Sequence, residues 1–298
     1  MKLVIGGANG LIGSELARTL RGRGDEVVAL VRKPRAAGDV MWDGRSLPPG
    51  VLDRADAAVN LSGANIGARR WSDAYKKEIV DSRVDSTRAF VDAMRAARSR
   101  PRVFVNASAV GAYGGRGDEE LTEESTRGAD FLAVVCKQSE AEALRADEIG
   151  VRTVLLRTGV VLARQGGALK QMLPPFKAFV GGPIGNGKQW FPWIHLGDEV
   201  GLILWALDGT VRGPLNAVAP DPVRMKDFAR ALGAALRRPA LFPVPALVLR
   251  LGLGEMAEVL LEGQRAVPRK ALDEGYRFRF PELKGALADL IGAPGGTA

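Results

Sequence analysis

The sequence contains only one cysteine, Cys136, and only one histidine, His195, among its 298 residues. A single cysteine excludes an internal disulfide framework, and nothing in the composition indicates an oxidising compartment. One histidine and one cysteine are too few for the usual zinc or copper ligand sets, so no metal is expected.

Long apolar runs are also missing. No segment approaches 18 uninterrupted apolar residues, so the sequence predicts no membrane-spanning helix and no membrane partner. Glycines and Asn9 interrupt the apolar run at the N-terminus, which makes it a poor signal peptide. The expected location is the cytoplasm.

Two common catalytic motifs are absent as well. The chain has neither a Walker lysine motif nor a Gly-x-Ser-x-Gly elbow, which argues against an NTPase and an α/β-hydrolase. The net charge of +8 raises nucleic acid as a partner. The basic residues are scattered over predicted helix ends and loops, however, and no nucleic-acid module is recognisable. We therefore expect a solvated, arginine-rich surface and no nucleic-acid partner.

The first 34 residues carry the strongest pattern. Residues 1–5 predict a buried strand, residues 14–23 a helix and residues 26–32 a second strand. A glycine-rich turn joins the first strand to the helix, and strand, turn, helix and strand are the context of a dinucleotide-binding fingerprint. The glycines are spaced G-x-x-G-x-x-G instead of G-x-G-x-x-G. The predicted cofactor turn comprises Gly7, Ala8, Asn9, Gly10, Leu11, Ile12 and Gly13.

Glycine is required at particular points of such a turn. Gly10 can let the main chain approach a pyrophosphate, and Gly13 can let the helix pack closely on the strand. The free N–H groups and the positive dipole end of the helix then face the phosphates. A turn that serves only compactness is the alternative, and the surrounding strands and helix favour the nucleotide site.

The end of the second strand indicates which nucleotide is bound. NAD sites usually place an acidic residue about 20 residues beyond the turn, where it holds the ribose 2′-hydroxyl. Here Arg32 and Lys33 occupy that place. A guanidinium can bind a 2′-phosphate bidentately, so the sequence predicts NADP(H), with a solvated basic loop as the alternative.

The pattern continues with alternating strands and helices up to residue 162. Three further core strands are predicted at 55–63, 102–108 and 151–157, the last running on to 162, with helices at 71–97 and 131–149. This alternation is typical of a doubly wound parallel sheet. A further strand is expected at 213–218.

The composition changes after Leu162. Residues 165–193 are rich in glycine, proline and aromatic residues, which suits a wall or lid over a pocket. The predicted fold is therefore α/β, a Rossmann-type doubly wound parallel sheet with a smaller, mainly helical C-terminal lobe. Residues 1–162 form the NADP-binding domain, its sheet completed by roughly 196–220, and residues 163–195 and 221–298 form the lobe.

Five motifs outside the glycine turn stand out along the chain. They are Arg70–Trp71, Asp81–Arg83, Gly181–Gly185 before Phe191–His195, Leu253–Ala257 and Leu261–Gln264. Together with the glycine turn they resemble the extended short-chain dehydrogenase/reductases, and more closely an atypical branch, the epimerase family proteins related to nucleoside-diphosphate-sugar epimerases. The resemblance covers nearly the whole chain, including the family's conserved C-terminal domain, and members are also labelled cell-division-inhibitor-like.

The resemblance implies further cofactor residues. Val31 with Arg32 would hold the adenosine 2′-phosphate, and Glu78 and Arg83 would reach the cofactor from the long helix. Cys136, beside Lys137, would approach the nicotinamide end. A solvated helix face is the alternative for Glu78 and Arg83, and inert packing the alternative for Cys136. The turn after the third strand would line the cofactor through Leu61, Ser62 and Gly63.

The usual chemistry of the superfamily uses a Tyr-x-x-x-Lys pair. Lys137 occupies the lysine position, but Ala133 stands where the tyrosine is expected, which puts ordinary alcohol–ketone chemistry in doubt. Ser108 matches the hydroxyl that orients a carbonyl. Tyr113 is a candidate substitute acid, with a packing role equally open, and His195 is expected to be structural. The predicted catalytic residues are Ser108, Tyr113 and Lys137.

The leading functional hypothesis is an NADP(H)-dependent oxidoreductase or epimerase-like enzyme. Its small-molecule substrate would be a carbonyl compound or a nucleotide sugar. The alternative is a non-catalytic NADP(H)-dependent sensor or regulator. A homodimer through the helix at 71–97 is expected only by analogy with the superfamily.

Overall fold

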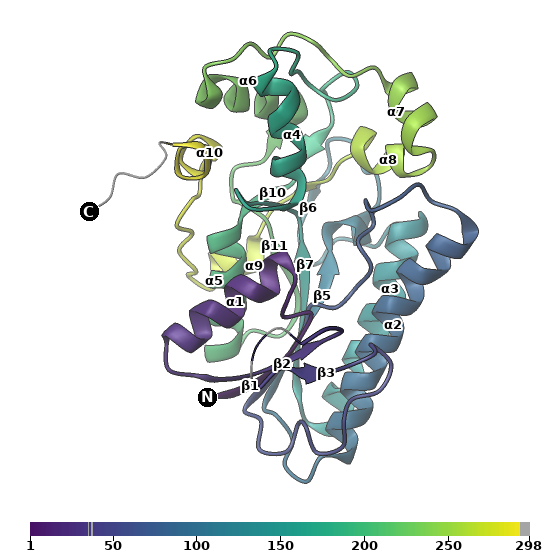
Figure 1. Cartoon of the computed structure of the whole chain (residues 1–298), viewed down its shortest axis with the longest axis vertical. Helices are drawn as coiled ribbons and strands as arrows, with labels where there is room; N and C mark the ends of the chain where they lie inside the picture. The colour runs from purple at the N-terminus through teal and green to yellow at the C-terminus, as the bar shows by residue number, and fades with distance from the viewer. Residues whose placement is uncertain (35, 37, 293–298) are drawn as a thin grey trace.

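The computed structural model describes residues 1–34, 36 and 38–292, and it contains one central parallel sheet (Figure 1). Seven strands follow the order β11-β7-β5-β4-β1-β2-β3, and every neighbouring pair is parallel. This confirms the predicted α/β fold with a parallel, Rossmann-like sheet. The strands are β1 (Lys2–Gly6), β2 (Glu26–Val31), β3 (Val40–Met41), β4 (Ala57–Asn60), β5 (Val103–Ala109), β7 (Arg152–Thr158) and β11 (Gly213–Ala217).

Helices cover both faces of the sheet and form two cores with it. Successive residues of β1 point to opposite faces, so Leu3 packs in one core and Val4 in the other. The core of Leu3 is covered by α1 (Leu11–Gly22) and α5 (Leu196–Asp208). The core of Val4 is covered by α2 (Asp73–Ala96) and α3 (Phe131–Leu144).

Local sequence explains why α1 forms where it does. Its buried residues Gly13, Leu16, Ala17 and Leu20 recur at three- and four-residue spacing and make one apolar stripe. The helix begins at Leu11, three residues before the predicted start, because Leu11, Ile12 and Gly13 of the predicted turn already form its first turn.

The C-terminal lobe is mainly helical, as predicted, and has its own core around Phe176, Phe228 and Trp193. Its short strands form two-stranded pairs outside the main sheet: β8 (Val160–Leu162) with β10 (Trp193–His195), and β9 (Trp190–Phe191) with β12 (Val223–Arg224). The helices are α4 (Gly167–Lys177), α6 (Met225–Leu236), α7 (Ala246–Leu253), α8 (Met256–Leu261), α9 (Arg269–Asp273) and α10 (Leu283–Ile291).

Two local predictions were wrong. Residues 151–162 were expected as one strand, but the chain leaves the main sheet at Gly159. There a Cβ would lie 2.1 Å from the Pro192 carbonyl oxygen, and β8 then pairs with the lobe strand β10. No strand was predicted between residues 108 and 131, yet this segment contains the short strand β6 (Glu120–Leu121), paired with β13 (Arg265–Ala266).

Across the described residues, none of the helices is long and apolar enough to cross a membrane.

Candidate functional site

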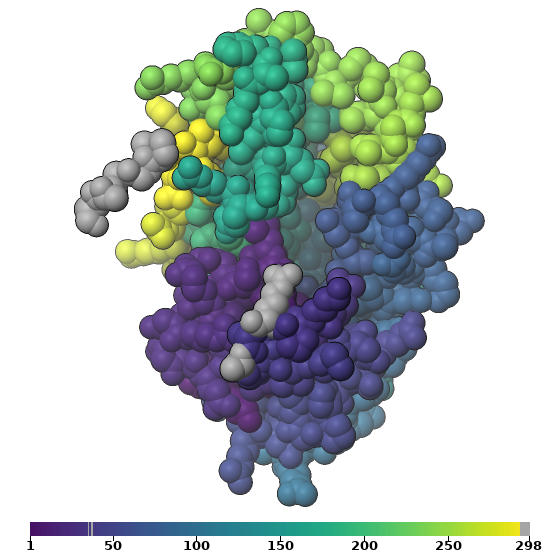
Figure 2. All heavy atoms as spheres, in the orientation of Figure 1, coloured from purple at the N-terminus to yellow at the C-terminus, as the bar shows by residue number. Residues whose placement is uncertain are grey.

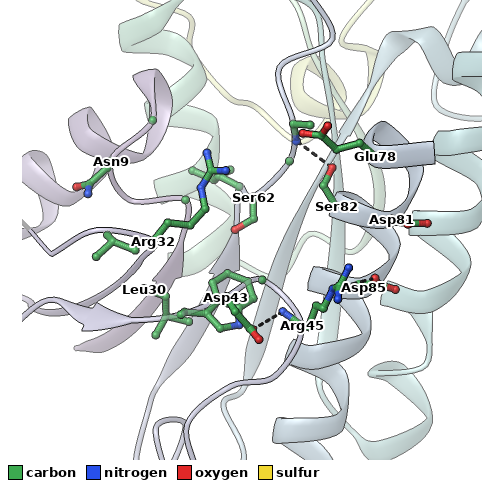
Figure 3. A pocket seen from close by; sticks show the side chains of 18 of the residues that line it. Asn9, Leu30, Arg32, Asp43, Arg45, Ser62, Glu78, Asp81, Ser82 and Asp85 are labelled. Atoms are coloured by element: carbon green, nitrogen blue, oxygen red, sulfur yellow. Dashed lines mark hydrogen bonds and ion pairs between the residues drawn. The ribbon is translucent and has the colours of Figure 1, made fainter. Parts of the chain in front are cut away.

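A cavity of about 900 Å³ opens at the carboxyl ends of β1, β2 and β4, against the start of α2 (Figure 3). This is the edge of an open parallel sheet at which ligands characteristically bind. Ten of the predicted cofactor residues line it: Gly7, Asn9, Gly10, Val31, Arg32, Lys33, Leu61, Ser62, Gly63 and Glu78.

The glycine turn forms one wall of the cavity. Gly7 has a φ of +75°, and a Cβ there would lie 2.7 Å from the Leu61 carbonyl oxygen. A Cβ on Gly13 would lie 2.3 Å from the Gly7 carbonyl oxygen, so glycine is required for the helix to approach the turn. Gly10 caps α1 without a side-chain hydrogen bond, and no acid occupies the first turn. The N–H groups that open α1 are therefore available to an anion.

The remaining turn residues lie behind the cavity. Ala8 is buried, and Leu11 and Ile12 pack against the core of Leu3. These residues and Gly13 shape the turn without lining the cavity.

The end of β2 brings cations to the cavity. The side chain of Arg32 lies between those of Asn9 and Ser62 in Figure 3. Asn9 donates a hydrogen bond from its amide to the Lys33 carbonyl oxygen at 3.3 Å, which ties the glycine turn to the end of β2.

Two buried polar atoms in the cavity wall have no hydrogen-bond partner among the described residues. They are the indole Nε1 of Trp42 and the hydroxyl Oγ of Ser62. The two side chains lie close together, because a Cβ on Gly6 would sit about 3 Å from both the Ser62 Oγ and the Trp42 Cζ3. An unsatisfied buried polar group costs about 1–3 kcal/mol, and a ligand with polar atoms in the cavity would satisfy it.

The sequence analysis missed part of the cavity wall. On α2, Lys77, Asp81 and Asp85 join Glu78, and their four-residue spacing was the signal that they share one face. Ser82 is also there, and its hydroxyl accepts a hydrogen bond from the Ala64 N–H at 2.9 Å.

The loop after β3 supplies the other missed residues, Asp43, Gly44 and Arg45. Asp43 accepts hydrogen bonds from the backbone N–H groups of Arg45 and Ser46, at 2.8 and 3.2 Å. These bonds lower the pKa of the Asp43 carboxyl below its ordinary value. Arg45 lies 4.0 Å from Asp85 on α2, across the cavity.

Arg83 and Cys136 do not line this cavity, but they lie next to it. A Cβ on Gly63 would be 3.1 Å from the guanidinium carbon of Arg83, whose Nη1 donates to the Ile79 carbonyl oxygen at 3.2 Å. Loss of solvation lowers the pKa of Arg83, and burial raises the pKa of the Cys136 thiol. The thiol contacts the Ala109 carbonyl oxygen at 3.8 Å.

Ser108 belongs to a buried ionic cluster. Its hydroxyl donates to Glu140 Oε1 at 2.7 Å, and the Arg157 guanidinium donates to both Glu140 oxygens, at 2.8 and 2.9 Å. Arg127 also donates to this carboxylate. Burial alone would raise the pKa of Glu140, but hydrogen bonds from Arg157 and its neighbours hold that pKa below its ordinary value. Glu140 is thus a carboxylate that fixes the direction of the Ser108 hydroxyl.

Tyr113 closes the same cluster from the other side. Its side chain is fully buried, and its hydroxyl donates to Asn216 Oδ1 at 2.6 Å and accepts from Arg157 at 3.0 Å. Burial raises the pKa of this phenol above its ordinary value of 10. The structure therefore does not bring Tyr113 to the cavity, and its environment makes it a weaker acid.

Lys137 lies on the exposed side of α3 and is not among the residues that line the cavity. Ala133, four residues earlier on the same helix, is buried. Of the three predicted catalytic residues, Ser108, half-buried at the carboxyl end of β5, and the buried Tyr113 share the Glu140–Arg157 cluster, while Lys137 lies apart from it.

His195 caps α5, in line with its expected structural role. Its Nδ1 accepts a hydrogen bond from the Gly197 N–H at 2.9 Å, and burial lowers its pKa.

Glu199, in the first turn of α5, is a buried acid that sequence patterns did not single out. Its Oε1 accepts from the Thr158 hydroxyl at 2.7 Å, and its Oε2 has no partner within the described part of the chain. Burial raises the pKa of Glu199 from the ordinary 4.5 to about 8. The carboxyl is therefore protonated in the folded protein at neutral pH.

We expect Glu199→Gln to stabilise the fold by about 3 kcal/mol at pH 7. The unfolded chain ionises near pH 4.5 and the folded chain near pH 8, so folding takes up a proton between these values. Stability of the wild type therefore falls as the pH rises through this window, and the variant removes that slope. Urea unfolding from pH 5 to pH 8.5 measures the free energy of unfolding and its slope with pH. The exposed Glu274→Gln is the control, and parallel pH profiles for wild type and Glu199→Gln would contradict the assignment.

Comparison with known proteins identifies the family. The family model of the NAD dependent epimerase/dehydratase family matches residues 3–218. The chain belongs to this family. A second model, a domain of unknown function (DUF1731), matches residues 244–290 of the lobe. Both matches confirm the resemblance drawn from the sequence motifs.

Members of this family align with the chain along nearly its full length. The mouse epimerase family protein SDR39U1 is 42% identical over 98% of this chain and 100% of its own. A solved relative is the crystal structure of human epimerase family protein SDR39U1 (isoform2) with NADPH, whose sequence is 40% identical to this chain. It superposes with a TM-score of 0.91 over 98% of this chain and 99% of that chain. MoeE5 in complex with UDP-glucose and NAD, at 22% identity and a TM-score of 0.76, shares the fold.

Proposed function

We propose that this chain binds NADP(H) in the 900 Å³ cavity, with the pyrophosphate on the opening turn of α1. The observation that carries the proposal is the pair Arg32 and Lys33 at the end of β2, where an NAD site has an acid. The unpartnered Trp42 and Ser62 atoms fit a polar ligand in the same cavity. The human relative crystallised with NADPH supports the same cofactor.

The other predicted residues keep their roles in this proposal. Leu61, Ser62 and Gly63 line the cofactor between the turn and α2. Glu78 faces the cavity and is held by an ion pair with Arg69 at 2.5 Å. Arg83 and Cys136 would lie toward the nicotinamide end. Among the residues that the structure describes, the Arg83 side chain makes one hydrogen bond, to the Ile79 carbonyl oxygen, which leaves its charge available to the cofactor.

We further propose an oxidoreductase or epimerase-like activity toward a small carbonyl compound or nucleotide sugar. NADP(H) would supply hydride transfer when bound. Ser108 would contact the substrate. Because its proton is directed to Glu140, Ser108 presents lone pairs and accepts a hydrogen bond from a substrate hydroxyl. We do not assign the proton transfer to Tyr113 or Lys137, since one is buried in the ionic cluster and the other is exposed.

The second candidate function is an NADP(H)-dependent sensor without turnover. The observation that favours it is α3, which has Ala133 in place of the usual tyrosine and an outward-facing Lys137.

The homodimer expected through the helix α2 remains a prediction. The outer side of α2 and α3 carries ion pairs such as Arg88–Glu142.

Fluorescence titration of the pure protein with NADPH and NADH tests the cofactor. We expect at least about tenfold tighter binding of NADPH, because only NADPH offers a 2′-phosphate to Arg32 and Lys33. Equal affinity would refute the role given to these cations. Screening carbonyl compounds and nucleotide sugars for NADPH oxidation then separates the two functions. The sensor function predicts that the protein binds NADPH but oxidises it with none of these compounds. It also predicts that another protein binds only when the cofactor is bound.

A further inference from the structure

The end of the lobe carries an exposed apolar surface, formed by the loop after α4, the segment before α7, and α7 itself. These segments gather at one end of the molecule, at the top of Figures 1 and 2. Leu241, Leu247 and Leu251 are 75%, 67% and 70% exposed. We call this surface the apical face and define it by Phe179, Val180, Leu241, Phe242, Leu247, Val248 and Leu251.

The helix α7 is unusual because none of its residues is buried. Leu247, Val248 and Leu251 are spaced so that they share one side of the helix. A surface helix normally turns its apolar side to the core. Here α7 packs against α8 and leaves that side open.

Two of the three segments of the apical face are held together by hydrogen bonds. The Phe242 N–H donates to the Gly181 carbonyl oxygen at 3.1 Å, and the Val244 N–H donates to the Pro183 carbonyl oxygen at 2.9 Å. The guanidinium carbon of Arg238 lies 4.3 Å from the centre of the Phe179 ring. The apolar side chains of these two segments therefore belong to a fixed patch, and α7 follows it directly after the N-cap Pro245.

Cations adjoin the apolar side chains of this patch. The segments that carry the apical face, residues 177–182, 237–244 and 246–251, contain no Asp or Glu. Their basic residues are Lys177, Arg237, Arg238 and Arg250. Arg250 is paired with Glu258 on α8. Within the described residues, Lys177, Arg237 and Arg238 have no carboxylate partner.

We propose that the apical face binds the surface of an anionic lipid bilayer. Exposed leucine and phenylalanine side chains next to Lys and Arg are what interfacial binding requires: apolar groups enter the headgroup region and cations meet the lipid charge. The sequence predicted no membrane partner because no segment can span a bilayer, and a face that lies on the bilayer needs no spanning helix. A two-fold dimer through this face is disfavoured, because it would place the same cations opposite each other. A nucleic acid would match the charge and leave the leucines exposed.

Sedimentation with lipid vesicles tests the proposal. At low salt, the full chain binds vesicles of equal parts phosphatidylcholine and phosphatidylglycerol at least about tenfold more tightly than vesicles of phosphatidylcholine alone. Raising the ionic strength to about 1 M removes most of this difference, because the Debye length falls to about 3 Å. The double variant Leu247→Ser/Leu251→Ser binds the anionic vesicles at least about tenfold more weakly, since both side chains lose their burial. Arg237→Gln/Arg238→Gln weakens binding to a similar extent and reduces its salt dependence.

Met41→Ser is the matched control, because Met41 is a 71% exposed apolar residue in β3, far along the chain from the apical face. It should bind vesicles like the wild type, and all variants should keep wild-type affinity for NADPH. Equal binding to neutral and anionic vesicles, or wild-type binding by the double leucine variant, overturns the proposal. A wild-type dimer in light scattering that the leucine changes convert to a monomer would assign the face to a second copy and overturn it too. So would binding of polyglutamate to this face without binding of anionic vesicles, which would indicate an acidic protein partner.

Discussion

Replacing Arg32 with Asp is expected to weaken NADPH binding about 100-fold and to leave NADH binding within about threefold of the wild type. The change removes a charge-assisted, bidentate donor and places a like charge beside the 2′-phosphate, which together cost about 3 kcal/mol. NADH carries a 2′-hydroxyl at that point, and a carboxylate can accept its hydrogen bond. Arg32 is exposed, so the fold should be unaffected.

The measurement is the same fluorescence titration with both nucleotides at one ionic strength. Arg277→Asp is the matched control, because it makes the same change in net charge on an exposed arginine outside the cavity. If Arg32→Asp and Arg277→Asp give the same NADPH curve, the phosphate lies elsewhere. Arg45, on the loop after β3, is then the next cation to test.

Replacing Glu140 with Ala is expected to destabilise the fold by about 3–5 kcal/mol, the usual cost of breaking a buried ion pair by removing one partner. Arg157 is only 2% exposed, and both of its hydrogen bonds to Glu140 would be lost. The wild type should also lose stability in acid. The pKa of Glu140 is lowered on folding, so its contribution is present above the ordinary value of 4.5 and disappears as the pH falls through the lowered one.

Urea unfolding of wild type and variant at pH 7 gives the difference in free energy. Glu142→Ala is the control on the same helix, where the carboxylate pairs with Arg145 and Arg88 near the surface and should contribute less than about 1 kcal/mol. The double change Glu140→Leu/Arg157→Met should recover most of the loss, since it leaves no buried charge unpaired. A Glu140→Ala protein within 1 kcal/mol of the wild type would show that the cluster is not a stabilising unit.

The nucleotide-binding half was predictable because its signals are local. The alternation of apolar strand and amphipathic helix, interrupted by glycine at Gly7 and Gly13, specified β1, α1 and β2 within 34 residues. The start of α2 is equally local, since the Ser72 hydroxyl caps the helix by accepting from the Tyr75 N–H. Conversely, β3 has only two residues, too few to show any periodicity, so the loop that carries Asp43 and Arg45 went unrecognised.

The site chemistry was less predictable because it depends on contacts between distant parts of the chain. Tyr113 is buried because its hydroxyl meets Asn216, 103 residues away, and no local pattern encodes that contact. On α3, a shift of one residue changes the direction in which a side chain points. Adjacent residues on a helix differ by about 100° in direction, which turns Cys136 inward and Lys137 to solvent. Spacing along the sequence alone therefore does not show which of two neighbouring side chains faces solvent.

The position of β11 has a consequence for how this protein is made. The strand pairs with β7, but 54 residues separate the end of β7 at Thr158 from the start of β11 at Gly213. One edge of β7 pairs with β5, and the other edge pairs with β11. On the ribosome, this other edge stays without a partner until residues 159–212 and then β11 have been synthesised. An unpaired edge is a template for strands of other chains. A fragment ending near residue 162 would therefore tend to aggregate, and the nucleotide-binding half depends on later sequence to complete its own sheet.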